Sequence, residues 1–66
     1  MSVAKIIELT ADGKSIEDAV QNAVSTANKS VRNITGVYVQ DIKGMVEDGA
    51  VTSFRVNCKV TFIVGD

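Results

Sequence analysis

The stretch TSFRVNCKVTFIV, Thr52–Val64, decides the fold of this chain. Apolar side chains occupy every second position of the stretch, and the positions between them are mostly polar or charged. Because successive residues of a β-strand point to opposite faces of a sheet, this period of two predicts a half-buried strand. One face consists of Phe54, Val56, Cys58, Val60, Phe62 and Val64, and the other of Ser53, Arg55, Asn57, Lys59 and Thr61. The strand offers more apolar surface than one short helix can cover, so we expect copies of the chain to pack together.

A helical pattern lies earlier in the chain, beginning after Ser15. Serine is a favoured N-cap because its hydroxyl accepts a hydrogen bond from an unpaired amide of the first turn. Glu17 and Asp18 add negative charge where the helix dipole favours it. The apolar residues then recur at helical spacing: Ile16, Ala19, Val20, Ala23, Val24, Ala27 and Val31. We expect the helix to end near Arg32, because a cation suits a helix C-terminus.

Two further strands surround this helix in the sequence. Val3–Thr10 reads as the first strand, and Ala11–Lys14 as the turn that follows it. After a connection at Asn33–Gly36, a second strand begins at Val37.

The second strand continues past Gly44 to Val46, and the glycine within it suggests a bulge or bend. Asp48 and Gly49 then form a strong hairpin signal within Glu47–Ala50. The last strand follows directly.

The order strand, helix, strand, strand indicates the α+β class, with a three-stranded antiparallel sheet packed on one helix. The length and apolar face of the last strand favour a central place for it in the sheet. We expect residues 1–66 to form a single domain, which at this size is only marginally stable alone. Cys58 is the only cysteine and the chain has no histidine, so neither an internal disulfide nor a structural zinc site is expected. Oligomerisation is therefore the feature that we expect to stabilise this small domain.

Composition argues against several classes of function. The net charge is −1 and the seven cations are scattered, which is unlike a nucleic-acid-binding surface. No apolar run approaches the roughly 20 residues that span a membrane, and no signal peptide precedes the first strand. A single free cysteine fits a reducing compartment, so we expect a soluble cytoplasmic protein. Without histidine, a glycine-rich phosphate loop or an activated nucleophile, the chain is not expected to be an enzyme.

Element order, length and local sequence together resemble the dodecin family. The segments that carry the resemblance are Ser15–Val24, Arg32–Val39, Val46–Ala50 and Phe54–Phe62. The resemblance implies a hollow homododecamer built from trimers. It also implies a flavin ligand (riboflavin, FMN or FAD) or another small ligand, and a role in storage rather than catalysis.

The cofactor site that the resemblance implies falls on Gly36, Val37, Tyr38 and Arg55. Flavin-binding dodecins carry a tryptophan at the position of Gly36, whose indole stacks on the flavin ring. Glycine offers no such face, and stacking contributes of order 1 kcal/mol beyond burial. Tyr38 lies about 6–7 Å further along the strand. Arg55 replaces a glutamine, and because it has donors only, it suits a phosphate or carboxylate rather than the flavin ring.

Each of these residues also has a structural explanation. Gly36 can be a permissive strand start, Arg55 a salt-bridged surface residue, and Tyr38 a contact between subunits. Asp41 corresponds to an acid near cations in some relatives, which makes it a candidate metal ligand, although hard cations take about six or more oxygens. Cys58 is expected to be a buried, inert thiol. Three functions therefore remain as hypotheses. They are a storage shell, a shell that holds another small ligand or a metal ion without flavin, and a weak enzyme.

Overall fold

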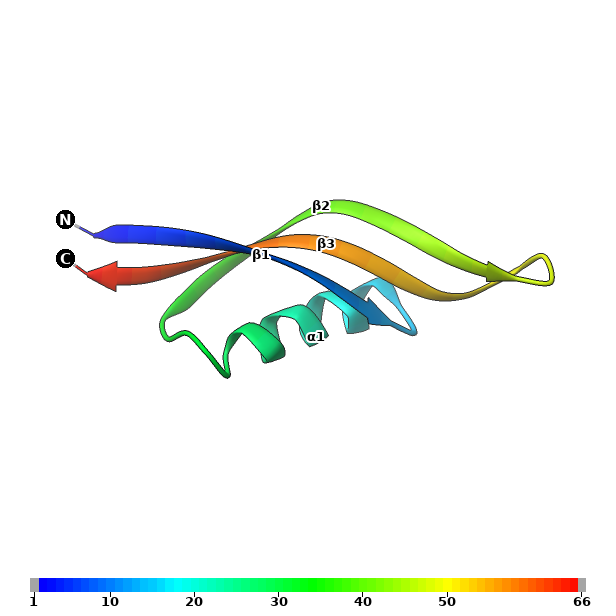
Figure 1. Ribbon diagram of the computed structural model, residues 1–66, viewed down its shortest axis with the longest axis horizontal. Coiled ribbons are helices and arrows are strands. Elements are labelled where there is room, and N and C mark those ends of the chain that lie inside the picture. The colour runs from blue at the N-terminus through cyan, green and yellow to red at the C-terminus, as the bar shows by residue number, and fades with distance from the viewer. Residues whose placement is uncertain (1, 66) are drawn as a thin grey trace.

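The computed structural model describes residues 2–65; Met1 and Asp66, the ends of the expected domain 1–66, lie outside the described residues. The elements follow the order β1 (Val3–Gly13), α1 (Ile16–Ala27), β2 (Ile34–Glu47) and β3 (Ala50–Gly65). The strands form one antiparallel sheet in the order β1-β3-β2, and α1 lies along one face of it (Figure 1). The α+β class and the central position of the last strand are confirmed.

The core lies between the middle of β3 and the helix. Val56, Cys58 and Val60 are fully buried, and Phe62 is nearly so. Facing them, α1 presents three buried alanines, Ala19, Ala23 and Ala27, whose small side chains let the helix approach the sheet closely. The predicted faces of β3 are therefore correct, although Val64 at the end of the apolar stripe extends past the helix and is exposed.

The helix begins where the sequence indicates but ends earlier. Ser15 is the N-cap, and its Oγ accepts a hydrogen bond from the amide of Asp18 at 3.0 Å. The C-cap is Asn28, so the expectation of a helix reaching Arg32 was wrong. Residues 28–30 turn instead, because Asn and Ser favour turns over helix interiors. Arg32 still interacts with the end of the helix, because its Nη1 donates a hydrogen bond to the carbonyl oxygen of Asn28 at 3.1 Å.

The end of β1 also differs from the sequence prediction. Residues 11–13 were expected in a turn, but they continue the strand and pair with residues 56–54 of β3. Gly13 is needed for close packing rather than for a turn: a Cβ there would lie 2.3 Å from the backbone nitrogen of Ala19. Asn22 of α1 fixes the same junction by donating to the carbonyl oxygen of Asp12 at 2.8 Å.

The second strand starts at Ile34, three residues before the predicted start at Val37. Its register against β3 shifts at three places, between residues 34 and 36, 39 and 41, and 45 and 46. A bulge or bend was suggested at Gly44, but Gly44 pairs directly with Phe54 and the nearest register shift lies one residue further on, between Met45 and Val46. The hairpin prediction is confirmed: Asp48 and Gly49 both have positive φ, 51° and 77°, as a type I′ turn requires.

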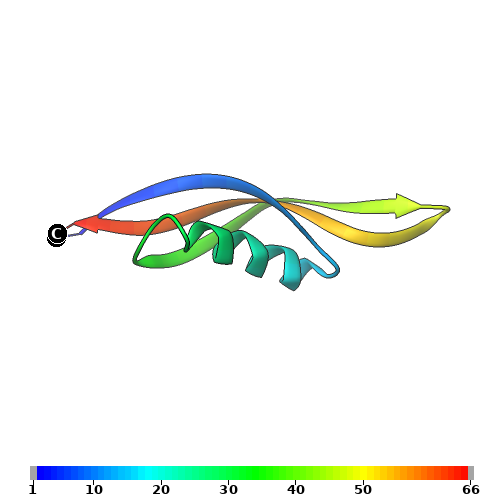
Figure 2. The same ribbon diagram turned by 60° about the horizontal axis from the view of Figure 1, so that its bottom comes forward.

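The molecule is elongated, with extents of 51 × 19 × 13 Å and a radius of gyration of 13.6 Å. A compact domain of this length has a radius of gyration of about 11 Å. The accessible surface is 4654 Å², against about 4,000 Å² for a compact 7.0 kDa chain. Figure 2 shows the reason: both ends of the sheet project past the helix. No helix within residues 2–65 is long and apolar enough to cross a membrane.

Candidate ligand-binding face

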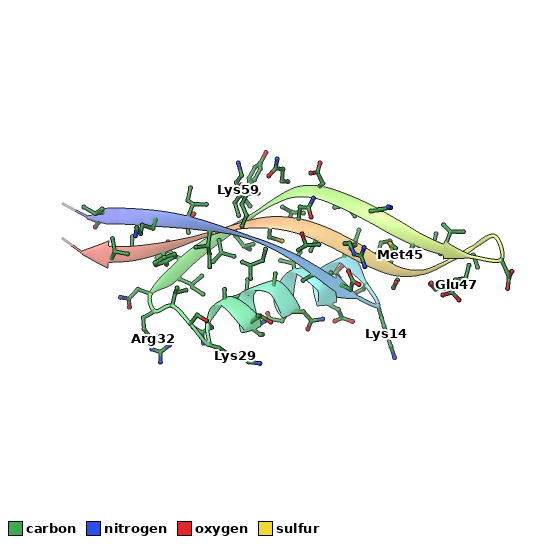
Figure 3. All side chains as sticks on the ribbon, viewed as in Figure 1. Lys14, Lys29, Arg32, Met45, Glu47 and Lys59 are labelled. Atoms are coloured by element: carbon green, nitrogen blue, oxygen red, sulfur yellow. The ribbon has the colours of Figure 1, made fainter. Side chains whose placement is uncertain are left out.

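The sheet face turned away from α1, called here the open face, carries most of the candidate site residues. Its side chains form rows across the strands, each with a β1 residue, a β3 residue and a β2 residue. Figure 3 shows Lys59 projecting from this side of the sheet, away from the helix. The rows are Asp12–Arg55–Lys43, Thr10–Asn57–Asp41, Glu8–Lys59–Tyr38 and Ile6–Thr61–Gly36.

Arg55 is held by an ion pair within the single chain. Its Nε lies 2.7 Å from Asp12 Oδ1 and its Nη2 lies 3.0 Å from Asp12 Oδ2. These hydrogen bonds, reinforced by the charge of the guanidinium, lower the pKa of the Asp12 carboxyl, and the same contacts raise the pKa of Arg55. The guanidinium is therefore fixed in direction, with its Nη1 not engaged by Asp12.

A hydrogen-bonded chain crosses all three strands in the next row. Thr10 Oγ1 donates to Asn57 Oδ1 at 2.8 Å, and Asn57 Nδ2 donates to Asp41 Oδ2 at 3.4 Å. Asp41 is thus oriented by a neutral amide. Within residues 2–65 no group of three or more His, Cys, Asp or Glu side chains converges as a metal site would need. Asp41 as a metal ligand stays a prediction.

Gly36 leaves an open space on this face. It pairs with Thr61 of β3, and a Cβ built on it would meet no atom within 4 Å. Tyr38, two residues on, lies on the same face and is 66% exposed. Val37 lies between them and pairs with the buried Val60, which places it on the helix side of the sheet. The structure therefore places Gly36 and Tyr38 on the open face, whereas Val37 lies on the opposite face of the sheet.

Arg55 is far from Gly36 in the same chain. Thr61, the partner of Gly36, lies six positions along β3 from Arg55, which is about 20 Å along a strand. No pocket is formed within residues 2–65. A single site that uses both Gly36 and Arg55 therefore needs two copies of the chain.

Sequence reasoning missed three residues that shape this face. Asp12 was placed in a turn, so its pairing with Arg55 across the sheet was not foreseen. Asn57 was assigned only to the polar face of the last strand, although it links two strands by hydrogen bonds. Lys43 was not singled out, although it lies directly opposite Arg55. Asp12 and Arg55 carry opposite charges and pair across the sheet. Their ion pair could have been predicted if the first strand had been extended to Gly13.

Cys58 lies on the helix side and plays no part in the open face. Its side chain is buried, and this burial raises the pKa of the thiol. A thiol that is both buried and protonated is unreactive. The expectation of an inert core cysteine agrees with this environment.

The chain is similar to known proteins in both sequence and structure. The sequence model of the Dodecin family matches residues 3–65. No curated protein sequence matches the chain. A protein from Thermus thermophilus superposes with a TM-score of 0.90 at 27% identity, covering 100% of this chain and 98% of that one. A tryptophan-to-phenylalanine variant of T. thermophilus dodecin gives 0.89 at 27% identity and covers 100% of both chains. Dodecin from Streptomyces coelicolor gives 0.88 at 26% identity, covering 98% of this chain and 94% of its own.

Proposed function

The chain belongs to the dodecin family, and from this we propose that it is a small-molecule binding and storage protein that works as a homododecamer built from trimers. The elongated shape and excess accessible surface of the single chain support assembly. We take residues 1–66 as one dodecin-like domain. The free, buried Cys58 supports a reducing compartment such as the cytoplasm as its location.

We place the ligand site on the open face, where two copies meet. The Gly36 and Tyr38 end of one copy supplies an open space beside an exposed aromatic ring, and the Arg55–Asp12 pair of another copy supplies fixed hydrogen-bond donors. The separation of about 20 Å between these groups in one chain supports a shared site. Each group can bind and orient a ligand, and none of them resembles an activated nucleophile or a general acid-base pair.

The open space at Gly36 is the observation that carries the proposal about which ligand binds. Flavin is the ligand of the family, yet this chain contains no tryptophan to stack on its ring. Arg55 cannot accept a hydrogen bond, so it does not replace a side-chain amide. We therefore propose that riboflavin, FMN and FAD bind weakly, and that the site suits a planar or anionic small molecule.

A shell that holds no flavin is the second candidate. Its support is the same Gly36, together with Asp41, whose carboxylate is oriented by Asn57 and lies on the open face. In this alternative the assembly is structural, or it holds a different small ligand or a metal ion.

Mass spectrometry of small molecules released from the purified assembly separates these candidates. The storage proposal predicts a bound organic molecule at a defined ratio to protein. The Asp12→Asn variant is the matched control, because it frees Arg55 from its ion pair and should change the ligand content without removing a core contact. A released organic molecule other than flavin at such a ratio would support the form of the second candidate that holds a different small ligand. An assembly that releases no organic molecule would contradict storage and leave a structural shell or a shell that holds a metal ion.

A further inference from the structure

Two aspartates of the chain are followed directly by glycine, Asp12 by Gly13 and Asp48 by Gly49. In such a pair the backbone nitrogen of the glycine can attack the carboxyl carbon of the aspartate, because glycine carries no Cβ that would block the approach. The same dipeptide thus occurs once in a strand and once in a turn. The surroundings of the two pairs differ, and this difference determines which pair reacts.

The reaction needs only water. The glycine nitrogen loses its proton and bonds to Cγ of the aspartate, while the protonated carboxyl loses an oxygen as water, which closes a succinimide ring. Water then adds back to the ring. Addition at the backbone carbonyl carbon breaks its bond to the nitrogen and leaves isoaspartate, in which the chain runs through Cγ, whereas addition at Cγ restores aspartate. The water released on closure is returned on opening, so no oxidant or cofactor takes part.

Asp48 and Gly49 lie at the tip of the β2–β3 hairpin, beyond the start of α1 (Figure 1). Glu47 pairs with Ala50, so the two central residues stand outside the ladder of backbone hydrogen bonds. Both are exposed, and a Cβ on Gly49 would meet no atom within 4 Å. Within residues 2–65, no side-chain hydrogen bond or ion pair holds the Asp48 carboxyl. The carboxyl and the amide are therefore free to rotate toward each other.

Asp12 and Gly13 have the same chemistry but are held in place. Arg55 binds both carboxylate oxygens of Asp12, at 2.7 and 3.0 Å. This ion pair lowers the pKa of Asp12, so the protonated form that loses water is scarcer. Asn22 donates to the carbonyl oxygen of Asp12 at 2.8 Å, and Gly13 packs against the backbone of α1. Ring closure here would have to break these contacts.

We propose that Asp48 converts spontaneously to isoaspartate in the folded protein, whereas Asp12 is protected by the contacts around it. The product lengthens the backbone of a two-residue turn, which then loses its type I′ geometry. It also carries a free α-carboxyl, so the chemical class of partner for the modified turn is a methyltransferase that esterifies isoaspartate. Ligand binding plays no part in this chemistry, so the site and the proposed function are independent.

Tryptic peptides separate the two aspartates. Cleavage after Lys and Arg places Asp12 in residues 6–14 and Asp48 in residues 44–55. The assembled protein is aged at neutral pH and digested, and isoaspartate is measured by methyl transfer from S-adenosylmethionine with an isoaspartate-specific methyltransferase. Isoaspartate should accumulate about tenfold or more faster in residues 44–55, because the carboxyl of Asp12 is held away from its reactive geometry. Equal rates, or no isoaspartate in residues 44–55, would overturn the proposal.

Two controls separate the fold from the local sequence. Asp48→Glu keeps the charge but would have to close a larger ring, so its peptide should carry no methyl label while residues 6–14 behave as in the wild type. Label that persists there would overturn the assignment to Asp48. The two free peptides, aged after digestion, should isomerise at similar rates because neither keeps the contacts of the fold. If the free peptides differed as much as the folded sites, local sequence would explain the difference and the protection of Asp12 would be refuted.

Discussion

Arg55 on β3 and Asp12 on β1 form a two-pronged ion pair, with Nε to Oδ1 at 2.7 Å and Nη2 to Oδ2 at 3.0 Å. The pair lies where β1 ends and the chain turns into α1, so it ties that junction to the central strand. It also fixes the direction of the guanidinium on the open face. One contact therefore links the stability of the fold to the chemistry of the candidate site.

The ion pair predicts a pH dependence of stability. Because the pKa of Asp12 is lowered in the folded chain, its contribution is present at pH values above about 4 and is lost as the pH falls through the lowered value. Between neutral pH and about pH 3, the urea midpoint of the wild type should therefore fall more than that of Asp12→Asn. Both groups are exposed, so the difference should be small and should shrink in high salt. Parallel pH profiles would contradict a stabilising role for the pair.

Gly13→Ala should destabilise the protein. The added Cβ would lie 2.3 Å from the backbone nitrogen of Ala19, so the helix must move away from β1. We expect a loss of about 1–3 kcal/mol in the free energy of unfolding, as for an overpacked core. Gly36→Ala is the matched control, because its Cβ meets no atom within 4 Å. Urea unfolding of both variants checks this, and equal stabilities would refute the tight junction.

Val60→Asp should prevent folding or assembly. Val60 is fully buried at the centre of β3, and an unpaired buried charge costs several kcal/mol. The control is the neighbouring Lys59→Asp, which introduces the same side chain on the open face. Circular dichroism and the melting temperature distinguish the two. A V60D protein that melts like the wild type would mean that the faces of β3 are misassigned.

Flavin should bind weakly. Losing the stacking contact and the amide contact, at roughly 1–2 kcal/mol each, weakens binding by about 30- to 1,000-fold relative to a tryptophan-bearing dodecin. Gly36→Trp should recover part of this affinity, because the space there is open, while Gly36→Ala should recover none. Quenching of flavin fluorescence on titration gives the affinities. Tight quenching by the wild type would mean that Tyr38 or another copy supplies the ring platform.

Local patterns predicted much of the fold. The alternation along β3, the serine N-cap and the Asp48–Gly49 turn are each set by a few neighbouring residues, and all three are confirmed. The end of β1 was not predictable in the same way. It depends on contacts of Gly13 with a helix residue and of Asp12 with a strand residue far along the chain.

The candidate site was less predictable for a related reason. Which residues share a row depends on the register of β2, and the register shifts twice between Ile34 and Asp41. Nothing in the local sequence marks these shifts. The distance between Gly36 and Arg55 follows only from the paired strands, so a site shared by two copies could not be inferred from either residue alone.

The mass of the assembly in solution tests the central claim most directly. Light scattering of the purified protein should give twelve times the chain mass of 7.0 kDa, because the excess accessible surface of the short chain supports assembly and the proposed dodecin-type shell has twelve copies. Dilution to micromolar concentration should leave this mass unchanged. A stable monomer or dimer under those conditions would contradict the account.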